Sequence, residues 1–177
     1  MISIVTPWRG HSELIEAYEA AVSGAEVIVV EQGGEGAGAL DHMCERLGSG
    51  SRALHFATPI GLARALNYGI AVGVGDPVVC LNNDIHGSTP HRANDWLRFV
   101  ERDTPERSLT GLAVLPFDID GDMIYYVDGW CVAARRETWH QINGWDAEHY
   151  PHLYAEDVDL SLRARILGCV LYQASWP

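Results

Sequence analysis

The chain has 177 residues, 47% of them hydrophobic, which is the composition of a globular protein with a core of its own. We therefore expect one domain spanning residues 1–177. The formal net charge is −12, and all twelve basic residues are arginine. An acidic chain without lysine or a basic run argues against nucleic acid or an anionic membrane surface as the main partner.

The cysteines and the N-terminus bear on the location of the protein. None of the four cysteines forms a Cys-x-x-Cys pair, which favours reduced, packed thiols and a cytoplasmic protein. No apolar run approaches the roughly 20 residues of a membrane-spanning helix. Met1 leads directly into a predicted strand, so we expect neither a signal peptide nor a transmembrane segment.

The first part of the chain alternates predicted strands and helices. Apolar runs predict strands over residues 2–6, ended by Pro7, and over residues 26–31. A helix capped by Ser12 and extending to about residue 23 lies between them. Strand, helix and strand at this spacing predict a right-handed parallel crossover. The pattern then predicts a helix over 39–47, a strand over 52–56 and a helix over 61–72.

A glycine-rich segment follows the second predicted strand. Gly34, Gly36 and Ala39 fit the loose dinucleotide pattern Gly-x-Gly-x-x-Ala, in which glycine lets the backbone approach a pyrophosphate. The next strand, however, is followed by Ala57-Thr58, with no acid to hold a ribose. We therefore interpret the segment as a glycine loop and not as a dinucleotide site.

The next predicted strand, residues 77–81, is followed directly by polar side chains. Asn82, Asn83 and Asp84 come after this short apolar run. In an open α/β sheet, ligands bind beyond the carboxyl ends of the strands. Oxygen-rich side chains at that edge suit Mg²⁺ or Mn²⁺ held together with phosphate oxygens. An ordinary turn after a strand remains the alternative.

The second part of the chain has shorter predicted elements. Asp118, Asp120 and Asp122 alternate in an acidic turn, and a solvated hairpin explains them better than a calcium loop, which needs a longer ligand set. The pattern predicts helices over 88–102 and 156–167, a short helix ending at 143–144, and strands over 110–116, 123–127, 130–134 and 169–175.

The last predicted helix begins with a group of acids. Glu156, Asp157 and Asp159 lie in its first turn. Acids at a helix N-terminus favour the helix macrodipole, and this is the structural interpretation. The functional interpretation is that one of these carboxylates is a general base. The residues alone leave both open.

Three segments of the chain form an ordered set. The first extends from residues 4–7 through residues 29–31. The second covers 61–70, 75–76 and 81–84, and the third covers 128–129, 135–136, 142–146 and 156–163. In their order and spacing, over nearly the whole chain, they resemble the GT-A glycosyltransferases, and among them the large inverting group that is similar to family 2 and includes rhamnosyltransferase-like members. Leu81-Asn82-Asn83-Asp84 resembles that group's Asp-x-Asp element.

The resemblance implies an α/β protein of the GT-A (nucleotide-diphospho-sugar transferase) fold, with a Rossmann-like mixed sheet that is mostly parallel and flanked by helices. It also implies an inverting enzyme that moves a hexosyl or deoxyhexosyl group from a UDP-, GDP- or dTDP-sugar. The acceptor would be a hydroxyl of a glycan, a protein or a lipid-linked molecule, and Mn²⁺ or Mg²⁺ would assist.

The resemblance also implies where the donor binds. Thr6, Pro7 and Glu31 would line the base and ribose pocket; the family usually has Asp at position 31, so the nucleotide stays open. Beside the ribose, the diphosphate and its metal would lie Asn82, Asn83 and Asp84. Two residues of the helix over 61–72 would complete this set: Arg64, as a phosphate ligand or a surface ion pair, and Asn67.

Asp157 matches the family's general base, with Glu156 as the second candidate. Many relatives carry a metal-binding histidine after the acidic helix, whereas this chain has no histidine beyond His152. His86 is a candidate substitute, although a solvated loop residue is the alternative. The short chain would be a minimal catalytic domain, a homo-oligomer, or one that needs a partner chain.

Two other functions compete with this one. A sugar nucleotidyltransferase shares the sheet, but usually has a basic glycine-rich loop after the first strand and a catalytic lysine, and this chain has no lysine. A non-catalytic sugar-nucleotide or glycan-binding module fits the short chain and the missing histidine. The presence of both Asp84 and Asp157 argues against a module that has lost its catalytic residues.

Overall fold

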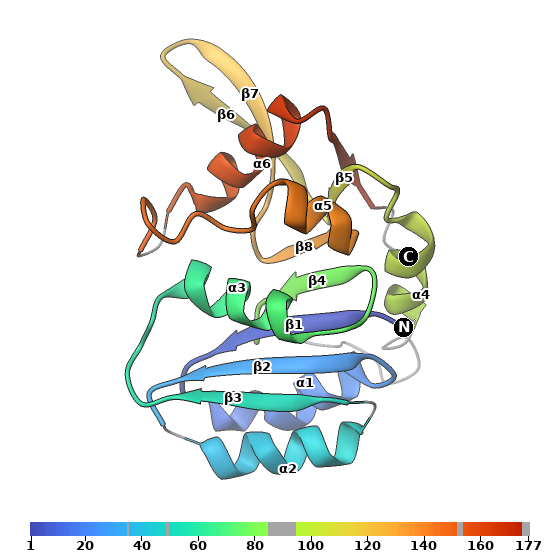
Figure 1. Cartoon of the computed structure of the whole chain (residues 1–177), viewed down its shortest axis with the longest axis vertical. Coiled ribbons are helices and arrows are strands. Elements are labelled where there is room, and N and C mark those ends of the chain that lie inside the picture. The colour runs from blue at the N-terminus through green and yellow to red at the C-terminus, as the bar shows by residue number, and fades with distance from the viewer. Residues whose placement is uncertain (35, 49, 85–94, 152–153, 175–177) are drawn as a thin grey trace.

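The computed structural model describes residues 1–34, 36–48, 50–84, 95–151 and 154–174 (Figure 1). The elements of the first half are β1 (Ser3–Trp8), the 3-10 turn η1 (Ser12–Leu14), α1 (Ile15–Val22), β2 (Glu26–Gln32), α2 (Ala37–Leu47), β3 (Arg52–Phe56), α3 (Leu62–Val72) and β4 (Val78–Leu81). Those of the second half are α4 (Asp95–Asp103), β5 (Ser108–Gly111), β6 (Val114–Ile119), β7 (Asp122–Val127), β8 (Cys131–Ala134), α5 (Arg136–Gln141), α6 (Glu156–Ile166) and β9 (Val170–Gln173).

Seven strands form one sheet in the order β3-β2-β1-β4-β8-β5-β9. Strands β3, β2, β1 and β4 are parallel to one another, and β9 is parallel to β5. Only β8 is antiparallel to the strands on either side of it. The predicted α/β architecture, a mixed and mostly parallel sheet flanked by helices, is confirmed.

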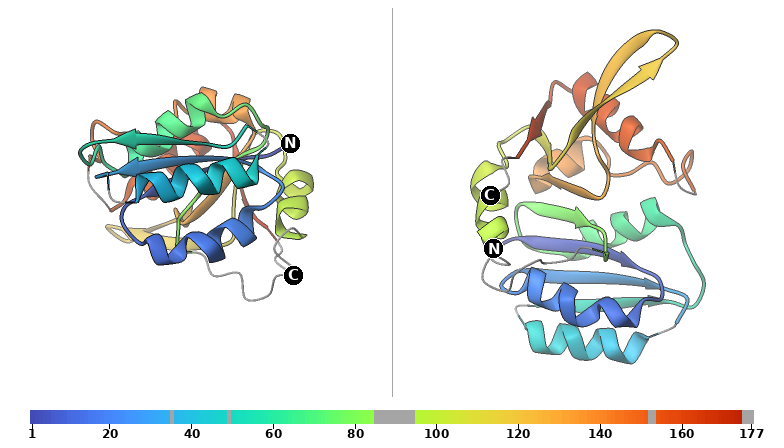
Figure 2. Two further views of the ribbon diagram at one scale, coloured as in Figure 1. Left: turned by 90° about the horizontal axis from the view of Figure 1, so that it is seen from below. Right: turned by 180° about the vertical axis from the view of Figure 1, so that it is seen from behind.

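Helices cover both faces of this sheet (Figures 1 and 2). Helices α1, α2 and α4 pack on one face together with Ile4 and Val29 of the central strands. Helices α3, α5 and α6 pack on the other face with Val5 and Val30. Because the central strands are buried on both faces, their sequences are continuous apolar runs, and this is why the sequence pattern identified them.

The hairpin of β6 and β7 projects from the end of the molecule (Figure 2). Residues 110–116, predicted as one strand, are divided between β5 in the large sheet and β6 in the hairpin, so that prediction was wrong. At Gly111 a Cβ atom would lie 2.1 Å from Cγ1 of Val127, so any larger residue would force its surroundings to shift. Asp118, Asp120 and Asp122 are exposed on the hairpin, as the solvated-hairpin interpretation predicted.

Two local predictions at the start of the chain were wrong. Pro7 does not end β1, which continues to Trp8. Strand β4 pairs with β1 only as far as Val5, so at Pro7 one side of β1 has no neighbouring strand and the missing N–H is tolerated. Ser12 is not a helix cap but the first residue of η1, which follows His11 in the left-handed region (φ 58°).

Three further expectations concern the thiols, the membrane and the region after β4. All four cysteines are buried and free, as predicted. Among the helices of the described ranges, none combines the length and the hydropathy needed to cross a bilayer. The helix start predicted at residues 88–90 lies outside the described residues, which resume with α4 at Asp95.

Candidate active site at the carboxyl edge of the sheet

The carboxyl ends of three parallel strands bring most of the predicted site residues to one edge of the sheet. Trp8, next to Pro7 at the end of β1, is in register with Glu31 of β2. On the other side of β1, strand β4 ends at the same edge and continues into residues 82–84. Asn82 and Asn83 are half-buried there and Asp84 is exposed.

The antiparallel strand β8 connects this edge to the acidic start of α6. Because β8 runs opposite to β4, its beginning adjoins the end of β4, and the Asn82 N–H donates to the Trp130 carbonyl over 3.0 Å. One residue earlier, the Gly129 N–H donates to Oδ2 of Asp157 over 3.1 Å. The amide-and-acid segment 82–84 and the start of α6 therefore flank the same short segment, 128–130.

Asp157 is a half-buried carboxylate that the backbone holds in place. Its Oδ1 accepts a hydrogen bond from the Val158 N–H at 2.9 Å, while Oδ2 accepts the one from Gly129. Burial raises the pKa of Asp157 above its usual value, and the charge of Asp128 raises it further, against the lowering by the backbone N–H groups. A Cβ at Gly129 would lie 3.2 Å from Cβ of Asp157 and 3.3 Å from its Oδ2, so glycine lets the two segments approach closely.

The neighbouring acids of α6 differ from Asp157. Glu156 is only 9% exposed, and its Oε2 has no hydrogen-bond partner among the described residues. A buried carboxylate oxygen without a hydrogen-bond partner is costly to the fold. Asp159, in contrast, pairs with Nε of Arg163 at 2.8 Å along the helix. Of the three acids, Asp159 is the one already satisfied by a cation.

Glu31 is fully buried at the end of β2 and its carboxylate is engaged by protein groups. Its Oε1 accepts the Gly34 N–H at 2.6 Å, and its Oε2 lies 3.4 Å from Nδ1 of His55. Nε2 of His55 lies 2.9 Å from Oδ1 of Asp41. The hydrogen bond to Asp41, with the one to Glu31, raises the pKa of His55. The glycine loop thus folds back on Glu31. Glu31, His55 and Asp41 form a cluster, and no sequence pattern indicated that His55 and Asp41 belong to it.

Thr6 and Asn67, both expected near the donor, make internal contacts. Thr6 has no exposed surface, and its hydroxyl is hydrogen-bonded to that of Tyr18. The Asn67 amide donates to the Trp145 carbonyl at 2.7 Å and accepts from the Trp145 N–H at 2.9 Å. Asn67 therefore connects α3 to the loop after α5. Arg64, one turn earlier on α3, is exposed and has no ion pair with any described residue.

Gln32 also positions this edge, although the sequence pattern ended the strand one residue before it. Its Oε1 accepts hydrogen bonds from the N–H groups of Ile60 and Gly61, both at 3.0 Å. Gly61 has φ 88°, and a Cβ there would lie 2.5 Å from the Pro151 carbonyl oxygen. Gln32 thus fixes the loop that leads into α3, and Gly61 lets residue 151 pack against it.

Few side chains at this edge could bind a divalent ion directly. Within the described ranges, no group of three or more His, Cys, Asp or Glu residues is arranged to hold a metal. Asp84 is an exposed carboxylate beside two half-buried amides, which fits an ion whose remaining ligands are diphosphate oxygens and water. His86, the proposed further ligand, lies outside the described residues.

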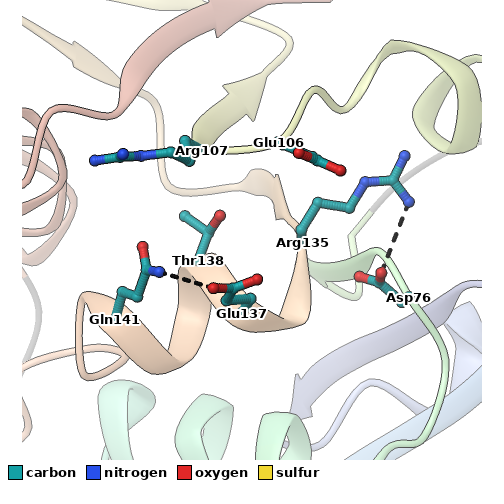
Figure 3. Close-up of a pocket in the computed structure, with 7 residues that line it drawn as sticks. All are labelled: Asp76, Glu106, Arg107, Arg135, Glu137, Thr138 and Gln141. Carbon is teal, nitrogen blue, oxygen red and sulfur yellow. Dashed lines mark hydrogen bonds and ion pairs between the residues drawn. The ribbon is translucent and has the colours of Figure 1, made fainter.

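A separate hollow of about 550 Å³ lies at the opposite, amino edge of the sheet (Figure 3). The residues that line it show its position, since residue 76 precedes β4 and residues 106–107 precede β5. Residue 135 follows β8, which runs antiparallel to β4 and β5 and so ends where they begin. Arg135 is held there by the Thr104 and Glu101 carbonyls at 3.0 and 3.2 Å and by Asp76 at 3.8 Å. This hollow is therefore not part of the carboxyl-edge site. Its lining residues are Asp76, Glu106, Arg107, Arg135, Glu137, Thr138 and Gln141.

No protein-family model and no curated protein sequence matches the chain. Solved structures do match in fold. The mannosyltransferase PcManGT from Pyrobaculum calidifontis, solved in complex with GDP-Man and Mn²⁺, aligns with a TM-score of 0.72 at 16% identity, over 97% of this chain and 53% of that one. TarS from S. aureus, residues 1–349, aligns with a TM-score of 0.65 at 14% identity, over 98% of this chain and 58% of that one.

A nucleotidyl transferase from Methanothermobacter thermautotrophicus also aligns, with a TM-score of 0.60 at 18% identity, over the whole of this chain and 88% of that one. At these identities the comparisons show the fold. The GT-A fold expected from the sequence is confirmed, and the chain spans about half the length of the mannosyltransferase that it matches.

Proposed function

We propose that the chain is a metal-assisted, inverting glycosyltransferase in which Asp157 is the general base. The observation that supports this most is the position of Asp157, whose carboxylate shares the segment 128–130 with the polar end of β4. In an open α/β sheet this edge is where a nucleotide ligand binds. The GT-A fold, shared with a mannosyltransferase solved with GDP-Man and Mn²⁺, is consistent with such a donor.

The proposed reaction needs one base and one anion-stabilising group on opposite sides of the sugar. Asp157 takes the proton of the acceptor hydroxyl as its oxygen attacks the anomeric carbon, and the nucleoside diphosphate leaves from the opposite face, which inverts the configuration. Its two backbone hydrogen bonds fix its orientation, and its raised pKa makes it a better proton acceptor than an exposed aspartate. Glu156 remains the second candidate, with its unpartnered oxygen in the same turn.

The leaving diphosphate would be met at the end of β4. Asp84 would hold a Mn²⁺ or Mg²⁺ ion together with diphosphate oxygens, and Asn82 and Asn83 would bind nearby donor atoms. When bound, such an ion offsets the negative charge that grows on the leaving phosphate. Arg64 is exposed without a described ion pair, so its guanidinium is free to donate charge-assisted hydrogen bonds to the same group.

Donor and acceptor are proposed only as classes: a UDP-, GDP- or dTDP-hexose or deoxyhexose, as in the rhamnosyltransferase-like group, and a hydroxyl of a glycan, a protein or a lipid-linked molecule. The base and ribose would lie near Pro7 and Glu31. Because Glu31 is buried and already bonded to Gly34, its contribution to the nucleotide site would be to hold the glycine loop. The four buried, free thiols fit the proposed cytoplasmic location.

A sugar nucleotidyltransferase is the second candidate, because the fold match to a nucleotidyl transferase covers 88% of that chain. The absence of lysine argues against it. The two reactions differ in their products: a nucleotidyltransferase releases pyrophosphate from a nucleoside triphosphate and a sugar phosphate, whereas a glycosyltransferase releases a nucleoside diphosphate from a sugar nucleotide.

Thermal unfolding with UDP, GDP, dTDP and CMP, each with and without Mn²⁺, tests the proposal. A ligand that binds only the folded state raises the free energy of unfolding, by about 2.7 kcal/mol when its concentration is 100 times its Kd, and therefore raises the melting temperature. We expect one nucleoside diphosphate to give an ion-dependent shift. The absence of a shift with every nucleotide would contradict a donor site, and a shift without turnover of any sugar nucleotide would favour the binding module.

A further inference from the structure

The projecting end of the molecule gathers most of its exposed apolar side chains. Twelve large hydrophobic side chains are exposed among the described residues, and eight of them lie here, four on the β6–β7 hairpin and four on the end of α6 and on β9. The hairpin strands contact β9, and α6 contacts both β7 and β9, so these parts adjoin one another. In the register of the hairpin, Phe117 and Ile119 lie on one of its faces, and Met123 and Tyr125 lie on the other. We call this the arm surface; its apolar members are Phe117, Ile119, Met123, Tyr125, Ile166, Leu167, Val170 and Tyr172.

Two elements of the arm surface are incomplete in the isolated chain. A two-stranded hairpin that projects into water is marginally stable alone, and among the described strands β6 and β7 pair only with each other (Figures 1 and 2). Strand β9 is the last strand of the seven-stranded sheet, and its sequence, Val-Leu-Tyr-Gln, contains no charge or proline to block further pairing. Apolar surface of this kind on a monomer indicates a protein interface.

The charges on the arm surface indicate which partner fits it. Asp118, Asp120 and Asp122 give the hairpin end a negative charge, and none of them has an ion pair with a described residue. Arg165 and Arg107 lie beside the other part of the surface, at the end of α6 and before β5, also without an ion pair among the described residues. Nη2 of Arg107 donates to the Leu167 carbonyl at 2.8 Å, which holds its guanidinium at that end.

We infer that the arm surface is the interface between two copies of this chain. A two-fold axis would place the acidic hairpin end of each copy against the arginine end of the other. Each opposite-charge contact and each apolar contact would then occur twice in the dimer. A lipid surface fits poorly, because three aspartates would face anionic headgroups and the whole chain has a net charge of −12.

Sedimentation equilibrium over a dilution series tests this inference. We expect the wild-type chain to dimerise, and Ile166→Asp to weaken the dimer about tenfold or more, because it places an acid where the partner's acidic hairpin docks. Ile166 is 82% exposed, so this variant should keep the melting temperature of the folded monomer. The matched control is Tyr68→Asp, at a 50% exposed aromatic on α3, outside the arm surface, and it should leave the dimer unchanged.

A charge exchange separates the arm surface from any other contact. Arg165→Asp alone should weaken the dimer. Adding Asp122→Arg should restore most of the affinity, because the new arginine on the hairpin of one copy would face the new aspartate on α6 of the other. A wild-type chain that stays monomeric at the highest concentration, or a dimer that is indifferent to Ile166→Asp and to the exchange, overturns the inference. Neither readout depends on catalysis, so the result is independent of the proposed function.

Discussion

The contact between Gly129 and Asp157 gives a prediction that follows directly from the geometry of the proposed base. In Gly129→Ala the new methyl group would lie 3.2 Å from Cβ of Asp157 and 3.3 Å from its Oδ2, a few tenths of an ångström closer than ordinary contact. The φ angle of Gly129 lies outside the left-handed region, so alanine adds no backbone strain of that kind. The cost therefore comes from the contact itself and falls on the carboxylate of the proposed base.

The size of this effect follows from packing and from the demands of catalysis. Inserting a methyl group into a packed contact costs about 1–3 kcal/mol. For a domain of this size each kcal/mol lowers the melting temperature by about 2–4 °C. A displaced base loses turnover steeply, since a shift of about 1 Å can cost 100-fold, and we expect a fall of about 10- to 100-fold here. Nucleotide affinity should change little, because the methyl group faces Asp157.

Release of nucleoside diphosphate from a panel of sugar nucleotides, together with thermal unfolding, measures both effects. Gly38→Ala in α2 is the matched control, because a Cβ there meets no atom within 4 Å. Alanine within a helix is favoured over glycine by about 0.5–1 kcal/mol, so this variant should be slightly more stable and equally active. Wild-type turnover and melting temperature in Gly129→Ala would refute the close contact on which the assignment of the base depends.

Three further variants test other parts of the site. Asn67→Ala should lower the free energy of unfolding in a urea titration by about 1–3 kcal/mol for each of the two backbone groups that it leaves without a partner; an unchanged value would mean that this amide is free for the donor. The pKa of His55 is raised in the folded state, so its stabilising effect is complete below the unfolded pKa of about 6.5 and is lost as the pH rises through the folded pKa. His55→Gln should therefore flatten the fall of melting temperature with pH above that value, and an unaltered pH profile would argue against the cluster. Asp84→Ala, at an exposed position, should keep the melting temperature of the free protein and lose the Mn²⁺-dependent part of the nucleotide shift; retention of that part would remove Asp84 from the ion site.

The parallel half of the sheet was predictable because each of its strands is marked by its own short stretch of sequence. Strands buried on both faces are continuous apolar runs, and the crossovers between them follow a fixed hand. The prediction failed at residues 110–116, where the chain leaves one sheet and enters another. Leu112 and Ala113, at the junction, are apolar and partly buried, as are Val114 and Leu115 at the start of β6, so polarity alone does not mark the break.

The candidate site likewise contains positions that the sequence could predict and contacts that it could not. Asn82, Asn83, Asp84 and Asp157 lie at the ends of predicted elements, so their places in the fold could be predicted from the sequence, while their roles stay predictions. The partners of Asn67 and Glu31 were not predictable, since they depend on pairs far apart in the chain. Asn67 and Trp145 are 78 residues apart, and no local pattern indicates that they meet.

The most direct test of the central claim is the turnover of a sugar nucleotide by Asp157→Asn, measured together with nucleotide binding. Asparagine fills the same space but cannot accept the proton, and loss of a general base costs about 100- to 10,000-fold. We expect turnover to fall by that factor with nucleotide affinity retained, whereas Asp159→Asn, which removes only an ion pair with Arg163 along α6, should remain active. Turnover close to that of the wild type in a folded Asp157→Asn protein would contradict the assignment.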